Sequence, residues 1–326
     1  MPARLEDAVH TDVARALESV DTPSAHEAVV GYTPLRDRLL VSPRMHRLLP
    51  DRAAMWLAAG RARVLWRLSE KRRQRARAQA ALMFEGTPLE PNLDSIAPRL
   101  AAEEAMRSAQ KPRMWMTEHY PVEGLGHLES ALAEGRGAIV FSVHMGAYCS
   151  VAWPLAHAGH PSYMTGADWL YADVYEGREA LTTLIMRSDW EKVGGRWVPR
   201  GGSYDVLKAL LERGELCLVM LDVPGSTNAR FLGKPAHLAS GLARLARDTG
   251  APLVPAFCHG GSARPRLVVE PPIDPAAFDS EDRLVKHLAD VGSRAILEVS
   301  PESWEPNDFP PLIFRELGEK HGWAFR

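Results

Sequence analysis

The feature that most constrains the fold is an alternation of two hydrophobic patterns that begins near residue 122. Short runs of aliphatic and β-branched residues alternate with segments whose apolar residues recur at helical spacing. The strand-like runs are GAIVFSV, LCLVMLDV, APLVPAFC and RLVVEPPI, and the helical segments are GLGHLESALAEG, SYDVLKALLERG and SGLARLARDTG. This order predicts an α/β fold in which helices flank a sheet. Ser240 is a predicted helix N-cap, and Gly214 and Gly250 are predicted C-caps.

The sequence before this region predicts helices of a different kind. Residues 1–50 show no sustained period and are expected to form an N-terminal extension, whereas residues 51–84 contain good helix formers without proline and predict one long helix. Its apolar residues Leu57, Val64, Leu65 and Leu68 share a helical face. Residues 301–326 are proline-rich and then briefly helical, which suggests a C-terminal tail that packs on the domain.

The middle of the predicted long helix is strongly basic. Tryptophans lie nearby, and cationic helices with interfacial tryptophans lie on anionic lipid surfaces. A second interpretation is a solvated basic face whose apolar stripe packs on the domain. The basic residues are Arg61, Arg63, Arg67, Lys71, Arg72, Arg73, Arg75 and Arg77, and the tryptophans are Trp56 and Trp66.

Composition excludes several classes of protein. A formal net charge of −2 over 326 residues gives no overall reason to expect nucleic-acid binding, and the three cysteines are too widely spaced for a disulfide framework or a zinc site. The N-terminus lacks the pattern of a secretory signal, and no apolar run is long enough to span a bilayer. We therefore expect a cytoplasmic protein whose membrane contact, at the inner face of the cell membrane, is peripheral.

Polar side chains end two of the strand-like runs, which is where ligands collect in α/β sheets. His144 follows GAIVFSV and could act as a general base, and Asp222 follows LCLVML and could orient a cationic group or hold a substrate hydroxyl. Each has a structural alternative, as a residue that satisfies a backbone group or caps a turn. The HGGS at 259–262 predicts a hairpin turn, and the motifs of nucleotide-binding proteins, serine hydrolases and zinc proteases are missing.

Several ordered blocks between residues 51 and 300 resemble the lysophospholipid acyltransferase superfamily, and within it the late lipid A acyltransferases. VEGLGHLESALAEGRGAIVFSVHMGAY looks like the lead into the family's catalytic motif, and FLGKPAHLASGLARLARDTGAPLVPAF is the most specific block. The resemblance implies one α/β domain over residues 51–300 with a mixed central sheet. It also implies transfer of an acyl group from an acyl carrier protein or coenzyme A thioester to a lipid or small-molecule hydroxyl or amine, with no cofactor.

The resemblance also implies roles for single residues. The family uses a histidine base and an acid five positions later, which fall on His144 and on Cys149. Arg187, Asp222 and Arg230 are the implied substrate-binding residues. A thiol cannot stabilise an imidazolium as a carboxylate does unless it is ionised.

Four interpretations of Cys149 follow. It could be a tolerated substitute while another acid such as Asp222 helps His144, or a nucleophile that carries the acyl group. It could mark a decayed site in a non-catalytic module that binds lipid or carrier protein. It could also be a buried hydrophobe, the usual fate of a lone cysteine.

Overall fold

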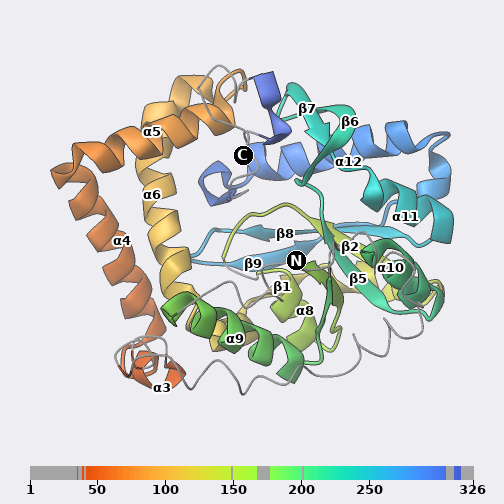
Figure 1. Cartoon of the computed structure of the whole chain (residues 1–326), viewed down its shortest axis with the longest axis horizontal. Helices are drawn as coiled ribbons and strands as arrows, with labels where there is room; N and C mark the ends of the chain where they lie inside the picture. The colour runs from red at the N-terminus through yellow and green to blue at the C-terminus, as the bar shows by residue number, and fades with distance from the viewer. Residues whose placement is uncertain are drawn as a thin grey trace, which may run out of the picture.

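The computed structural model describes residues 35, 39, 42–147, 150–166, 177–199, 202–305 and 312–316. Among these, seven strands form one sheet in the order β1-β9-β8-β2-β5-β3-β4 (Figure 1). All neighbours are parallel except β8 and β9, so the sheet is mixed, as predicted. The strands are β1 (Val122–Glu123), β2 (Ala138–Ser142), β3 (Tyr163–Gly166), β4 (Arg196–Pro199), β5 (Leu216–Met220), β8 (Leu253–His259) and β9 (Arg266–Val269).

Helices cover both faces of the sheet. The central strand β2 is fully buried, and its side chains alternate between two cores because successive residues of a strand point to opposite faces. Ile139 and Phe141 pack with α5, α6, α10, α11 and α12, and Ala138 and Val140 pack with α7, α8 and α9. The helices are α3 (Pro43–His46), α4 (Asp51–Leu68), α5 (Glu70–Phe84), α6 (Leu93–Gln110), α7 (Leu125–Leu132), α8 (Ala152–His157), α9 (Gly177–Lys192), α10 (Ser203–Glu212), α11 (Gly241–Thr249) and α12 (Glu281–Glu298).

The local signals of the α/β region are confirmed where the structure describes them. Ser240 is the residue before α11, and Gly214 and Gly250 take positive φ angles of 83° and 67° after α10 and α11. The HGGS segment connects the antiparallel strands β8 and β9 and therefore forms the predicted hairpin turn.

A second hairpin, β6 (Pro224–Phe231) with β7 (Lys234–Leu238), leaves the main sheet directly after Asp222. Both residues of its two-residue turn, Leu232 and Gly233, have positive φ, as a type I′ turn requires. The ammonium group of Lys234 is buried and donates hydrogen bonds to the carbonyl oxygens of Leu82 and Met83 at the end of α5. The hairpin thus anchors the helical layer beside the sheet.

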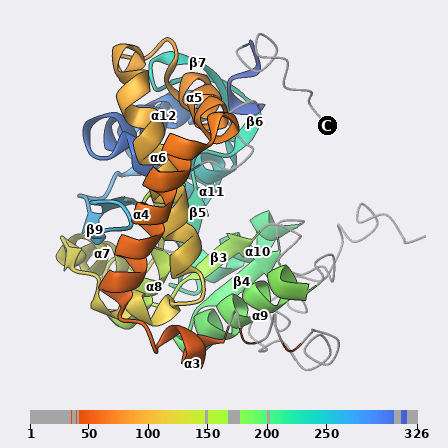
Figure 2. The same ribbon diagram turned by 90° about the vertical axis from the view of Figure 1, so that its left-hand side faces the viewer.

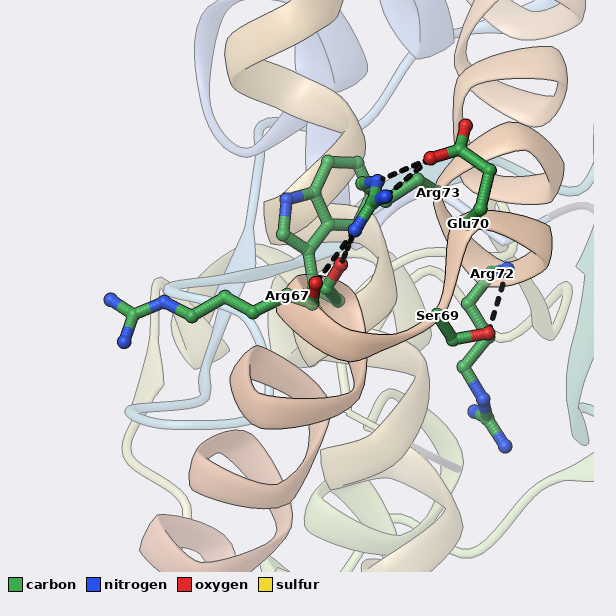
Figure 3. A network of polar contacts seen from close by, with 6 residues as sticks. Arg67, Ser69, Glu70, Arg72 and Arg73 are labelled. Atoms are coloured by element: carbon green, nitrogen blue, oxygen red, sulfur yellow. Dashed lines mark hydrogen bonds and ion pairs between the residues drawn. The ribbon is translucent and has the colours of Figure 1, made fainter.

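The single long helix predicted over residues 51–84 is wrong, because the chain breaks into α4 and α5 at Ser69. Ser69 has extended backbone angles, and its hydroxyl accepts a hydrogen bond from the amide of Arg72. The guanidinium of Arg73 pairs with Glu70 and donates to the carbonyl oxygens of Trp66 and Arg67, which α4 leaves without helical partners (Figure 3). Side-chain capping therefore compensates the break, although no proline or glycine marks it.

Helix α4 lies outermost and packs on α6 (Figure 2). Its buried residues are the small or flexible Ala54, Met55 and Ala59, which allow a close approach to α6. Of the four residues of the predicted apolar face, Leu57, Val64 and Leu68 are exposed and Leu65 is half-buried. The interpretation in which this stripe packs on the domain is therefore wrong for the three exposed residues. No helix of the described residues has the length and apolar character needed to cross a bilayer.

The segment after α12 enters the core next to the sheet. A short 3-10 helix, η7 (Pro301–Ser303), leads into Trp304, which is fully buried. Ile313 and Phe314 are also buried in the same core. These residues bring the last described part of the chain against the C-terminal ends of the central strands.

Candidate active site

The two polar residues that end strand-like runs lie side by side. β2 and β5 are parallel neighbours in a register that pairs Ser142 with Met220, and the amide of Leu221 donates to the carbonyl oxygen of Ser142 at 2.7 Å. His144 and Asp222 each follow their strand by two residues. The carboxyl ends of parallel strands meet at one edge of a sheet, which is the usual place of a ligand site in this architecture.

Asp222 is the hydrogen-bonding centre of this edge. Its Oδ1 lies 2.8 Å from Nδ1 of His144, and its carboxylate also accepts the backbone amide of His144 at 3.0 and 3.1 Å. The indole Nε1 of Trp304 donates to Oδ2 at 2.8 Å. Asp222 is 0% exposed, so its carboxylate has no contact with bulk solvent. The arrangement fixes both the orientation and the tautomer of the imidazole.

The charges and hydrogen bonds of this pair shift the pKa values of both residues. Burial alone would raise the pKa of Asp222, but the adjacent imidazole and the hydrogen bonds from His144 and Trp304 hold it below its usual range. Burial lowers the pKa of His144, and the negative charge of Asp222 outweighs that effect and raises it above the ordinary value. A histidine that gains a proton easily while a carboxylate stabilises it has the properties of a general base.

A cavity of about 360 Å³ opens beside His144. Its remaining walls come from the ends of β3 and β5 and from α10 and α11, and most of them are aliphatic. The lining residues are His144, Thr165, Ser203, Tyr204, Leu207, Val219, Met220, Val223, Ala239, Gly241, Leu242, Arg244 and Leu245. An apolar cavity with one polarised base suits a ligand that has a hydrocarbon part and a reactive polar end.

One polar contact joins α10 and α11 beside the cavity. The hydroxyl of Tyr204 donates to the carboxylate of Asp248, and the guanidinium of Arg244 stacks over the Tyr204 ring at 4.5 Å. Burial and the Asp248 carboxylate raise the pKa of Tyr204 to about 12, so its phenol stays protonated. Tyr204 and Arg244 had no motif to mark them in the sequence.

The loop after His144 is packed tightly against β8. Gly146 has φ of +83°, and a Cβ atom at this position would lie 2.4 Å from Sγ of Cys258. Cys258 is fully buried, and burial raises the pKa of its thiol, as it does for Cys217. These two thiols are inert structural groups. Cys149, the residue at the expected acid position, lies outside the described residues.

The three implied substrate-binding residues occupy different places. Asp222 lies behind His144 and is not part of the cavity wall, so its contacts are those of an orienting residue. Arg187 lies on α9 and is half-buried, and Arg230 lies exposed on β6, where it donates to the carbonyl oxygen of Gly233. Neither arginine lines the cavity described above.

Sequence reasoning missed the contribution of Trp304. This residue lies 82 positions after Asp222, in a proline-rich segment without a recognisable motif. Its only signal was a tryptophan in a stretch that is otherwise polar. Among the described residues, no cluster of histidine, cysteine or carboxylate side chains has the geometry of a metal site.

Comparison with known proteins places the chain in a family. A family model described as "Bacterial lipid A biosynthesis acyltransferase" matches residues 42–305. Phosphatidylinositol mannoside acyltransferases from two strains of Mycobacterium tuberculosis, H37Rv and CDC 1551, are each 28% identical over 145 residues. That match covers 42% of this chain and 43% of each relative, so the chain spans less than half the length of the curated relatives it matches.

Among solved structures, the 1-acyl-sn-glycerophosphate acyltransferase PlsC from Thermotoga maritima matches with a TM-score of 0.39 and 16% identity, over 62% of this chain and 82% of that one. Because the family model covers most of the sequence, from α3 to the residue after Trp304, the assignment depends on the whole α/β unit and not on a short motif. The chain belongs to the bacterial lipid A biosynthesis acyltransferase family.

Proposed function

We propose that this protein transfers an acyl group from an acyl carrier protein or coenzyme A thioester to a hydroxyl or amine acceptor, with His144 as the general base. The single observation that carries the proposal is the hydrogen-bonded pair of His144 and Asp222, of which His144 lines an apolar cavity. The pair supplies proton transfer, and the cavity supplies a place for the acyl chain beside the reacting carbonyl.

The geometry assigns a role to each nitrogen of His144. Nδ1 is engaged by Asp222, so Nε2 takes the proton from the acceptor as its oxygen or nitrogen attacks the thioester carbonyl. Asp222 stabilises the imidazolium that forms. When the tetrahedral intermediate collapses, the C–S bond breaks, and His144 returns the proton to the departing thiolate of the donor.

Cys149 has two possible roles in this reaction. Asp222 already orients His144, so an acid at position 149 is not required for that purpose and the acceptor can attack the donor directly. In the second route, Cys149 takes the acyl group as a thioester and then passes it to the acceptor, and His144 serves both half-reactions. Exchange between two thioesters is nearly balanced in energy, so the second route adds no large thermodynamic barrier.

The surface of α4 supports docking to an anionic membrane. Among the described residues, all of the large hydrophobic side chains that are strongly exposed lie between residues 35 and 68. Trp56 is 68% exposed and Leu68 is 78% exposed. We call the group formed by Trp56, Leu57, Arg61, Arg63, Val64, Arg67 and Leu68 the outer face of α4, since these residues are exposed. Apolar insertion combined with several cations is the chemistry that binds anionic lipid.

Some basic residues of α4 and α5 already have partners within the protein, and others remain exposed for lipid. Arg73 bonds to Trp66 and Glu70 at the break between α4 and α5, and Arg77 pairs with Asp94. The side chains of Arg67 and Arg72 point away from that network (Figure 3). Lipid headgroups would therefore meet Arg67 and its neighbours on the outer face of α4, whereas changing Arg73 would disturb the helix break itself.

The test of the proposed function is an acyl-transfer assay with purified protein, acyl-CoA and acyl carrier protein thioesters as donors, and hydroxyl and amine acceptors. His144→Gln should lower turnover by about 10²- to 10⁴-fold, because a positioned general base contributes that much. Exposed His127→Gln on α7 is the matched control. Binding of donor without turnover by the wild type would favour a non-catalytic module and would contradict the proposal.

Intact-protein mass spectrometry distinguishes the two routes. The wild type, Cys149→Ser and Cys149→Ala are incubated with the thioester donor. An acyl adduct on the wild type alone assigns the covalent route. Transfer activity that survives in Cys149→Ala, without an adduct on the wild type, assigns direct attack assisted by His144.

A further inference from the structure

We propose that the three residues Ser303, Trp304 and Glu305 form the positioning element of the active site, and that Trp304 fixes the Asp222 carboxylate against His144 through its indole N–H. The inference rests on the proposed function in one respect: it assigns a role to residues that act through His144. Trp304 does not line the cavity and is therefore a positioning residue, not a catalytic one.

The indole of Trp304 is held in one orientation. Its Nε1 donates to Oδ2 of Asp222 at 2.8 Å, and the residue is 0% exposed. Its ring centroid lies 6.1, 5.8 and 6.4 Å from those of Phe84, Phe231 and Phe314. Aromatic neighbours at such distances leave the indole no room to turn away from the carboxylate.

The backbone of the same segment holds the histidine. The amide of Glu305 donates to the carbonyl oxygen of His144 at 2.5 Å, and the amide of Gly146 donates to the carbonyl oxygen of Ser303 at 2.9 Å. Met145 and Trp304 form an antiparallel bridge between these contacts. Three consecutive residues therefore set the position of both His144 and its carboxylate partner.

A buried arginine braces this segment from α6. Arg107 donates from its Nη1 to the carbonyl oxygen of Ser303 at 2.9 Å and forms an ion pair with Glu305 at 2.5 Å. Arg107 is itself buried, so its hydrogen bond to Ser303 is shielded from water, whereas the Glu305 side chain is 33% exposed. Arg107 thus connects the positioning element to α6, a long helix that packs against α4 and α5.

Several charged or polar groups lie near His144. The carboxylates of Asp222 and Glu305 raise that pKa, and Arg107 partly neutralises Glu305. Arg244 and the protonated Tyr204 share the cavity with His144. The indole N–H of Trp304 lowers the pKa of Asp222 and so weakens this carboxylate as a partner for the imidazolium. Removal of that N–H should raise the pKa of His144.

The experiment is an NMR titration of the His144 ring, assigned by the loss of its signal in His144→Gln. Trp304→Phe keeps an aromatic ring and removes the donor. We expect the pKa of His144 to rise in this variant, by about one pH unit at most. Trp115→Phe is the control. Trp115 also donates from its indole Nε1 to an aspartate, Asp51, with a distance of 3.1 Å between the two atoms, and this pair lies away from the site. An unchanged His144 pKa in Trp304→Phe overturns the inference.

Glu305→Gln tests the segment a second way and covers the case in which Trp304→Phe does not fold. It should lower the pKa of His144, the opposite sign, because the Glu305 carboxylate raises it. An unchanged pKa there also counts against the inference. Kinetics give an independent measurement: in Trp304→Phe kcat should fall about tenfold with KM unchanged. A protein that transfers no acyl group would contradict the proposed function alone, since the titration needs no turnover.

Discussion

The active-site edge of the sheet and the outer face of α4 use charge in opposite ways. At the edge, Asp222 has no exposed surface and accepts hydrogen bonds from both His144 and Trp304. On the outer face, the arginines are exposed and stand beside equally exposed Trp56 and Leu68. Burial makes each group at the edge depend on its partners, whereas water screens the arginines from one another.

The difference explains which positions tolerate change. A buried carboxylate that loses its partner keeps its desolvation cost, so single changes at the edge should be large and non-additive. Exposed side chains add little to folding, so changes on the outer face should leave stability almost intact and affect only binding. Under the proposed function, one region would carry out the chemistry, and the other would hold the protein at the membrane.

The largest effect should follow Asp222→Asn. Turnover should fall by about 10²- to 10⁴-fold, because the base loses the charge that stabilises its protonated form. In the wild type, activity requires neutral His144 and should rise with pH through a pKa above 6.5. In the variant the negative charge at position 222 is gone, so burial lowers the pKa of His144. The midpoint of the pH–activity profile should therefore move to lower pH. The pH dependence of kcat/KM measures both effects, with exposed Asp290→Asn on α12 as the control.

A double change, Trp56→Ser with Leu68→Ser, tests the outer face directly. Burial of one large apolar side chain is worth about 1.5–3 kcal/mol, so the loss of two should lower affinity for anionic vesicles by about 10²- to 10⁴-fold. Thermal unfolding should stay the same, because both side chains are already exposed. Vesicle co-sedimentation measures the binding. Equal binding by the variant and the wild type would remove this surface from the proposal.

The buried cation Lys234 should make stability depend on pH, unlike the exposed arginines. Burial lowers its pKa from 10.5 to about 7, so between these values the unfolded chain binds more protons and the folded state gains stability as pH rises. From pH 8 to pH 9 the wild type should gain about 1.4 kcal/mol relative to Lys234→Met. Urea unfolding at each pH measures this difference. Exposed Lys192→Met is the control variant.

The smallest effects belong to single arginines of the outer face. Arg63→Gln and Arg67→Gln should each weaken binding to anionic vesicles about fivefold, since one cation near the surface contributes about 1 kcal/mol. The two effects should add and should fade at high salt. Binding measured at low and high ionic strength tests both statements. Strong coupling between the two positions would show that they act as one built site and not as a diffuse surface.

The sequence allowed the central part of the fold and half of the site to be predicted. Long aliphatic runs mark β2, β5, β8 and β9, and the polar residues that end two of them, His144 and Asp222, do meet. β3 (YMTG) and β4 (RWVP) lack the run of aliphatic residues that marks these four strands. The break at Ser69 was hidden because side-chain hydrogen bonds compensate it and no proline or glycine marks it, and the exposed face of α4 follows from its packing on α6.

The distance along the chain between Asp222 and Trp304 has a consequence for biosynthesis. These contacting residues are separated by 82 positions, and His144 and Asp222 by 78. At about 5–20 residues per second, the ribosome needs roughly 4 to 16 s to add Trp304 after Asp222. During that interval the carboxylate and the histidine can meet without their brace. A nascent chain that has not yet reached Trp304 therefore lacks this hydrogen bond to the Asp222 carboxylate, and under the proposed function the aligned base would form only after Trp304 has been added.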